Sequence, residues 1–121
     1  MNGSGLNVQS HGSVSVVTFP DVLDVECVQH LSPQLYALVE QPPTPHLLLD
    51  FRNVRFLSSR ALGVLLTLRR KADPSGVQVA FSAMRPELLR VFQLTKLDAL
   101  FRFFGSQDEA LAAWGTPPTR A

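Results

Sequence analysis

The fold is decided by residues 46–73, which run HLLLDFRNVRFLSSRALGVLLTLRRKAD. The stretch opens with an apolar run, 47–51, directly behind Pro45. Such a run between turn residues is typical of a strand that is buried on both faces, as the strands of parallel sheets are. A polar connector, 52–55, separates this strand from two serines and a helical segment. The unit is therefore strand, loop, Ser-Ser, helix.

The predicted helix runs from Arg60 to Ala72. Ser58 or Ser59 occupies its N-cap position, where a side-chain oxygen accepts a hydrogen bond from an unpaired backbone N–H group. Three cations fall in the last predicted turn, where they suit the helix dipole: Arg69, Arg70 and Lys71. Three residues then end the helix: Asp73, Pro74 and Gly76.

The position of the two serines favours a functional site. Open α/β sheets bind their ligands at the carboxyl ends of the strands. A helix N-terminus also carries unpaired N–H groups and a partial positive charge, which would stabilise a phosphate on Ser59. The simpler interpretation is that both serines only cap the helix.

The remaining segments alternate between strand and helix patterns. Strands are predicted at 6–10, 13–19, 77–81 and 100–104, and helices at 24–39, 87–92 and 107–114. Pro33 predicts a kink or a break near Ser32, because proline lacks an N–H group and clashes with the preceding turn. Ser106 and Glu109 form a capping box before the last helix. The order β-β-α-β-α-β-α-β-α predicts one α/β domain with a mixed sheet of about five strands and about four helices.

Length and composition fit one globular domain. The 121 residues are 45% hydrophobic and 17% charged, and the net charge of +1 points neither to nucleic acid nor to a strongly acidic partner. Cys27 is the single cysteine, which excludes an internal disulfide. No apolar run approaches the ~20 residues of a membrane span, and the start lacks a basic signal segment, so we expect a cytoplasmic protein without membrane insertion. We divide the chain into a flexible lead (1–5), one domain (6–114) and a flexible tail (115–121).

Catalytic motifs are absent from the sequence. The three histidines, His11, His30 and His46, are scattered and show no metal-ligand spacing. No motif supplies a base for Ser59, and there is neither a nucleophile elbow nor a glycine-rich phosphate loop. We therefore expect no enzyme, no cofactor and no metal.

The helix after Ser59 has two different faces. Its apolar residues share a stripe that should pack on the sheet: Ala61, Leu62, Leu65, Leu66, Leu68 and Ala72. The opposite face carries polar and small residues that leave a shallow surface for a partner: Arg60, Gly63, Thr67, Arg70 and Lys71. With Arg52, Arg55 and Arg69, this unit holds six of the eleven basic residues. They form either an ordinary solvated helix face or an electropositive dock for an acidic partner.

The central stretch resembles the signature of the STAS domain, the module of bacterial anti-sigma factor antagonists. That pattern is a buried strand ending in Asp, a connector, an aromatic and an aliphatic residue, Asp or Ser, a serine, and a helix with Gly followed by Val-Leu-Leu. Residues 49–51, Val54 and 56–66 fit it without a gap, and weaker flanks extend the likeness to about residues 6–113. Arg60 and Ala61 depart from the pattern, which usually has a small hydroxyl residue and Gly there.

The resemblance implies the fold and the function of an anti-sigma factor antagonist. Ser59 takes the place of the serine that a partner kinase phosphorylates, and Ser58, the second choice, takes a place where the family often has Asp. The implied partner is an anti-sigma factor with a GHKL-type ATP-binding kinase fold, and a phosphatase completes the cycle. The implied partner surface comprises Asp24, Ser58, Ser59, Arg60, Gly63 and Thr67. Asp24 is either part of that surface or the N-cap of its own helix.

The departures at Arg60 and Ala61 leave a second interpretation open. A STAS module that is not phosphorylated would act as a scaffold in a sensory assembly, or as an accessory subunit of a transporter complex. The two interpretations share the fold and the surface and differ in whether Ser59 is modified.

Overall fold

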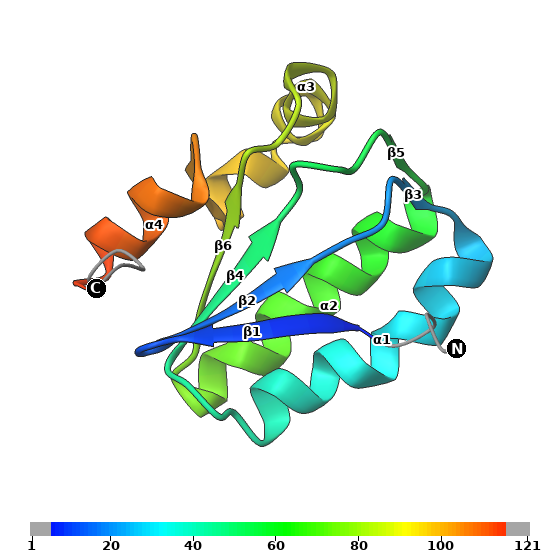
Figure 1. Cartoon of the computed structure of the whole chain (residues 1–121). Helices are drawn as coiled ribbons and strands as arrows, with labels where there is room; N and C mark the ends of the chain where they lie inside the picture. The colour runs from blue at the N-terminus through cyan, green and yellow to red at the C-terminus, as the bar shows by residue number, and fades with distance from the viewer. Residues whose placement is uncertain (1–5, 116–121) are drawn as a thin grey trace.

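The centre of the molecule is a five-stranded mixed sheet in the order β1-β2-β4-β6-β7 (Figure 1). The computed structural model describes residues 6–115, so the predicted lead at 1–5 and residues 116–121 of the predicted tail lie outside the described residues. The strands are β1 (Asn7–His11), β2 (Val14–Thr18), β4 (His46–Asp50), β6 (Gln78–Ser82) and β7 (Arg102–Phe104). β1 pairs antiparallel with β2, and the other neighbours pair in parallel. The predicted α/β class and mixed sheet are confirmed.

Four α-helices of the described residues surround this sheet. They are α1 (Val25–Glu40), α2 (Ser59–Ser75), α3 (Pro86–Leu94) and α4 (Gln107–Ala113). α1 and α2 lie side by side against one face, α4 packs on the other face, and α3 lies beyond the ends of β4 and β6 (Figure 1). α1 and α2 both connect parallel strands that follow one another across the sheet. Because such crossovers are right-handed, both helices fall on the same face.

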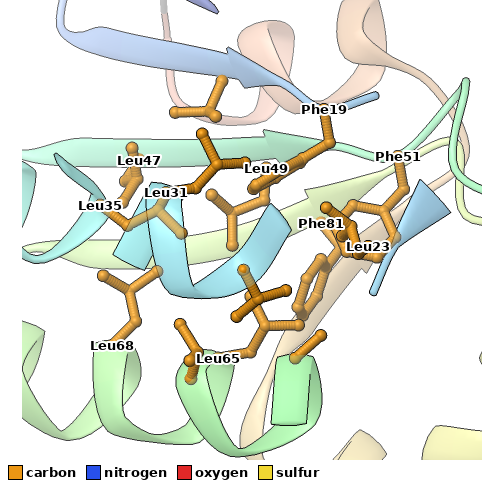
Figure 2. Packing of buried hydrophobic residues seen from close by; sticks show 14 of the residues in the cluster. Phe19, Leu23, Leu31, Leu35, Leu47, Leu49, Phe51, Leu65, Leu68 and Phe81 are labelled. Atoms are coloured by element: carbon orange, nitrogen blue, oxygen red, sulfur yellow. The ribbon is translucent and has the colours of Figure 1, made fainter. Parts of the chain in front are cut away.

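The main core fills the layer between the sheet and the pair α1 and α2 (Figure 2). Leu49 and Phe81 come from neighbouring strands, while Leu65 and Leu68 come from α2, and all four are buried. The Phe51 ring meets the Phe81 ring edge-on with centroids 5.1 Å apart. Each buried side chain of this kind contributes about 1.5–3 kcal/mol to the free energy of unfolding. This packing fixes the rotation of α2 about its axis and so determines which residues face outward.

Of the kink or break predicted near Ser32, the break is wrong. α1 runs unbroken from Val25 to Glu40 with Pro33 inside it. Proline leaves the carbonyl of Gln29 without its usual donor. The Ser32 hydroxyl donates to that carbonyl at 3.4 Å. Buried side chains lie on both sides of the proline (Val28, Leu31, Leu35 and Val39), so packing on the core outweighs the local preference for a break.

The predicted end of α2 is also wrong. The helix continues through Pro74 to Ser75, and Gly76 forms its C-cap with a φ of 73°, which glycine adopts without strain. The three predicted last-turn cations therefore lie one turn too early, and the last turn holds no basic residue. Similarly, the strand predicted at 100–104 begins only at Arg102, because Leu97–Leu100 forms a 3-10 helix.

A second, two-stranded sheet was not predicted from the sequence. It pairs β3 (Val22–Leu23) in parallel with β5 (Phe56–Leu57) and lies near the N-terminal ends of α1 and α2 (Figure 1). Leu23 is buried in the core while Val22 is exposed. Strands of two residues are too short to show a hydrophobic period, so no sequence pattern predicts them.

Candidate functional site

The two serines at the start of α2 have different roles. Ser58 is the N-cap, and its hydroxyl accepts a hydrogen bond from the Ala61 N–H at 3.1 Å. Its carbonyl accepts from the Leu62 N–H at 3.1 Å. Ser59 is the first residue of the helix, its side chain is exposed, and its hydroxyl makes no hydrogen bond within residues 6–115. The cap and the accessible hydroxyl are therefore separate residues.

The loop before these serines is held in place by backbone hydrogen bonds. The Ser58 N–H donates to the Leu23 carbonyl at 3.0 Å. The Asp21 carbonyl accepts from the Arg55 N–H at 2.7 Å and from the Phe56 N–H at 3.2 Å. Because β3 is tied to β5 in this way, the start of α2 has a fixed position relative to the start of α1.

The N-terminal turn of α2 carries no acidic residue. The other described α-helices each have one or two there, namely Glu26 in α1, Glu87 in α3, and Asp108 with Glu109 in α4. A helix N-terminus bears a partial positive charge that such carboxylates offset. At α2 this charge is not offset by the helix itself, and Arg60 adds a full positive charge beside it. The site therefore favours an anion near Ser59.

A shallow groove of about 660 Å³ runs between α1 and α2 beside Ser59. Four of the predicted surface residues line it: Ser59, Arg60, Gly63 and Thr67. Three further lining residues were not predicted for this surface: Ser32, Tyr36 and Val64. Ser32 and Tyr36 are four positions apart, so they share a face of α1 once that helix is continuous. The expected break at Ser32 hid this signal.

Two predicted residues do not line the groove. Asp24 is the N-cap of α1, and its carboxylate accepts a hydrogen bond from the Cys27 N–H at 2.9 Å. Ser58 is the N-cap of α2. The structure shows Asp24 as a cap, and its place in the partner surface stays a prediction. Both residues fix the helix starts that border the groove.

Gly63 lies one turn after Ser59 in α2, and because it has no side chain the helix backbone is uncovered there. A Cβ atom at this position would meet no atom within 4 Å. Glycine inside a helix costs about 1 kcal/mol relative to alanine. The fold therefore has no steric need for this glycine, and the missing side chain leaves the α2 backbone accessible beside the groove.

Three of the six basic residues in the segment from Arg52 to Lys71 form ion pairs. Arg52 pairs with the buried Asp50 carboxylate at 3.0 Å, and Lys71 pairs with Glu40 at 2.8 Å. Arg69 forms a longer pair with Asp73 at 3.5 Å. The three remaining cations form no ion pair within the described part of the chain: Arg55, Arg60 and Arg70. The positive charge available to a partner is therefore smaller than the sequence suggests, and Arg55 and Arg60 are the unpaired cations that lie near Ser59 in the sequence.

Cys27, the single cysteine, lies near the start of α1 and is partly buried. Burial, and to a lesser extent the neighbouring Asp24 charge, raises the pKa of the Cys27 thiol, which keeps it protonated and weakly nucleophilic. Residues 6–115 hold no cluster of three metal-ligating side chains. None of their helices is long and apolar enough to span a bilayer. The arrangement is suited to binding a surface and to accepting an anion.

Comparison with known protein families matches the STAS domain model to residues 5–110. A STAS-domain containing protein of Pseudomonas aeruginosa is 26% identical over 101 residues, which is 84% of this chain and 89% of that protein.

Solved structures give the same result. An anti-sigma factor antagonist from Mycobacterium paratuberculosis is 30% identical with a TM-score of 0.75, covering 89% of this chain and 91% of that one. The phosphorylated form of the Bacillus cell fate determinant SpoIIAA has a TM-score of 0.73 at 16% identity, covering 90% of this chain and 98% of that one. At that identity the second likeness concerns the fold alone.

Proposed function

The chain belongs to the STAS-domain family of anti-sigma factor antagonists, and from this premise we propose that it binds an anti-sigma factor and thereby frees a sigma factor. The proposed partner has a GHKL-type ATP-binding kinase fold and phosphorylates Ser59. The observation that carries the proposal is the exposed, unbonded Ser59 hydroxyl at a helix start with no acidic residue of its own, beside an open groove. We take residues 6–114 as the binding module and the cytoplasm as its location.

In the unmodified state the groove between α1 and α2 receives the partner. Gly63 allows close approach to the backbone of α2, and Thr67 continues the low surface along the same helix face. Arg60 offers an unpaired positive charge at the edge of the groove. Association through such a surface requires no rearrangement of the core.

A phosphate on Ser59 would end this association. It adds about −1.5 to −2 charges and three strong hydrogen-bond acceptors to the groove. Removing that charge from water against an unmatched partner surface costs several kcal/mol. In the free protein the same phosphate is stabilised by the N–H groups and the partial positive charge at the start of α2. The switch is therefore local, and a phosphatase restores the binding form.

The geometry favours Ser59 over Ser58 as the modified residue. The Ser58 hydroxyl is half-buried and already accepts the Ala61 N–H. A phosphoryl group on Ser58 would disturb the N-cap, which is worth about 1 kcal/mol.

A displacement experiment tests the proposed activity. Complexes of each GHKL-type anti-sigma factor of the source genome with its sigma factor are titrated with the unmodified chain. We expect one complex to release its sigma factor and to form a stable complex with this chain. If no complex releases its sigma factor, the proposed antagonist activity is wrong.

Arg60 supports a second candidate function. Its guanidinium, adjacent to Ser59 and without an ion pair in the described residues, is able to pair with a phosphate and to reduce the repulsion that the switch requires. The chain would then be a constitutive STAS scaffold or an accessory subunit. A Ser59→Asp protein that binds its partner as tightly as the unmodified chain would favour this function.

A further inference from the structure

The small sheet of β3 and β5 presents two apolar side chains to the surface. Val22 and Phe56 are direct cross-strand partners in this parallel pair. Because the strands are in register, their side chains lie on the same face, while Leu23 and Leu57 point toward the core. Val22 is 40% exposed and Phe56 is 51% exposed. Val25, at the first position of α1, is 49% exposed.

These exposed side chains have no evident role in holding the fold. Leu23 and Leu57 already pack on the main core, and the backbone hydrogen bonds from Asp21 and Leu23 hold the two strands together. Val22 and Phe56 are adjacent rather than scattered, and adjacent exposed apolar side chains are typical of an interaction surface. We define Val22, Val25 and Phe56 as the apolar patch.

The apolar patch is continuous with the site around Ser59. Phe56 precedes Ser59 by three residues, and Ser58 is hydrogen-bonded to β3 through the Leu23 carbonyl at 3.0 Å. Figure 1 shows β3 and β5 near the N-terminal ends of α1 and α2. A partner that covers Ser59 from this end therefore also meets the small sheet.

Charges of opposite sign border the apolar patch. On the β3 side, Asp21 and Glu26 are exposed, and on the β5 side Arg55 and Arg60 are exposed. None of these four side chains takes part in the ion pairs that the structure of residues 6–115 contains. An apolar centre with a charged rim is the usual composition of a protein interface. The opposite signs on the two sides fix the orientation of whatever binds there.

We propose that the apolar patch is the anchoring half of the docking surface, and that Phe56 enters an apolar pocket of the anti-sigma factor. The pocket has acidic residues on the side that meets Arg55 and Arg60, and basic residues on the side that meets Asp21 and Glu26. This proposal rests on the proposed function. It assigns most of the binding affinity to the apolar patch, and it assigns the regulation by phosphorylation to the groove beside Ser59. The groove with Ser59 responds to phosphorylation, whereas the patch holds the partner.

Alanine substitution at Phe56 tests the anchor. The probe is the purified GHKL-type anti-sigma factor that the unmodified chain binds in the displacement experiment, and Kd is measured by calorimetry. We expect Phe56→Ala to raise Kd about thirtyfold, as interface aromatic residues commonly do. Phe56→Leu, which keeps an apolar side chain, should stay within about threefold. Leu94→Ala is the matched control, because Leu94 is 71% exposed on α3 and lies outside the patch, and it should leave Kd unchanged.

The outcomes separate this proposal from the proposed function. If Ser59→Asp abolishes binding but Phe56→Ala binds like the unmodified chain, the anchor is wrong and the antagonist function stands. If no anti-sigma factor binds the unmodified chain, both are wrong. Circular dichroism melts establish that each variant is folded.

Charge reversal and self-association complete the test. Arg55→Glu should weaken binding about tenfold through loss of the paired acidic residues on the partner. Arg70→Glu is the control for charge, because Arg70 lies about three turns along α2 from Ser59 and outside the apolar patch. If Arg70→Glu weakens binding of the anti-sigma factor as much as Arg55→Glu does, the assigned orientation is wrong. Sedimentation of the chain alone should show a monomer. A dimer that Phe56→Ala dissolves would show that a second copy covers the patch, which overturns the proposal.

Discussion

The helices α2 and α4 both begin with a serine N-cap, but only α4 completes the cap with acidic residues. At α4 the Ser106 hydroxyl accepts from the Glu109 N–H at 3.1 Å, and the Glu109 carboxylate accepts from the Gly105 N–H at 3.1 Å. Asp108 adds a second acidic residue to the same turn. At α2 the Ser58 cap is followed by Ser59 and Arg60 instead.

This difference distinguishes a structural helix start from one that is open to a ligand. At α4 the Ser106 hydroxyl likewise caps one N–H group of the first turn, but the carboxylates of Asp108 and Glu109 also offset the dipole. At α2 the cap satisfies one N–H group, and the remaining positive potential faces the surface beside an accessible hydroxyl. The comparison therefore supports the proposal that Ser59 is the phosphorylated residue, because a phosphate there would meet an uncompensated helix dipole without displacing a cap.

The largest expected effect concerns partner binding at equivalent positions of the two helices. Ser59 and Gln107 are each the first residue of their helix. Ser59→Asp should raise the Kd for the anti-sigma factor about 100-fold or more, because a buried charge without a partner costs several kcal/mol. Gln107→Asp is the control with the same charge at the other helix and should leave Kd unchanged in calorimetric titration. Equal effects would show that net charge alone weakens binding.

The second prediction concerns the stability that each serine provides. Ser58→Ala and Ser106→Ala should each lower the free energy of unfolding by about 1 kcal/mol, since each removes an N-cap. Ser59→Ala should change it by less than about 0.5 kcal/mol, as is usual for exposed positions. Urea denaturation measures all three. If Ser59→Ala is as destabilising as Ser58→Ala, the division of roles between the two serines is wrong.

The third prediction concerns Gly63, because α2 has a glycine near its start and α4 has none. Gly63→Ala should raise the free energy of unfolding by about 1 kcal/mol, because alanine is the better helix former and the new methyl meets no neighbouring atom. The same methyl should weaken binding of the anti-sigma factor, since it fills part of the groove. The two effects have opposite signs, and urea denaturation together with calorimetry measures them. A variant that binds like the unmodified chain would show that the partner does not approach α2 closely at this point.

The smallest expected effect is on helix stability. Ser59→Asp should stabilise the free protein by about 0.5 kcal/mol at low ionic strength, because it places the first carboxylate in the first turn of α2. Gln107→Asp should gain less, because Asp108 and Glu109 already occupy that turn of α4. Thermal melts at low and high salt compare the two variants. The gain at Ser59 should decrease with added salt, and a gain that is independent of salt would exclude the dipole explanation.

Much of this account follows from local sequence patterns. The apolar run at 47–51 identified the central strand, because a buried parallel strand needs no polar alternation. The Ser106–Glu109 spacing identified the cap of α4, although the carboxylate bonds to Gly105 rather than to Ser106 itself. Ser58 was one of two candidates for the N-cap of α2, and only the geometry of the turn decides between neighbouring serines.

The remaining features depend on contacts between distant residues. Pro33 is tolerated inside α1 because the core holds both halves of the helix, which local propensity does not reveal. The groove becomes visible only when Ser32 and Tyr36 lie opposite Ser59 across two packed helices. The apolar patch requires the pairing of Val22 with Phe56, which are far apart in the sequence.

The most direct test of the central claim is the intact mass of the protein after incubation with ATP and each GHKL-type kinase of the source genome. The account predicts one kinase that adds about 80 Da, the mass of one phosphoryl group, and no addition to Ser59→Ala. A mass gain that persists in Ser59→Ala and disappears in Ser58→Ala would place the switch on the capping serine. A stable complex with a kinase and no mass gain would contradict the switch and leave a constitutive binding module.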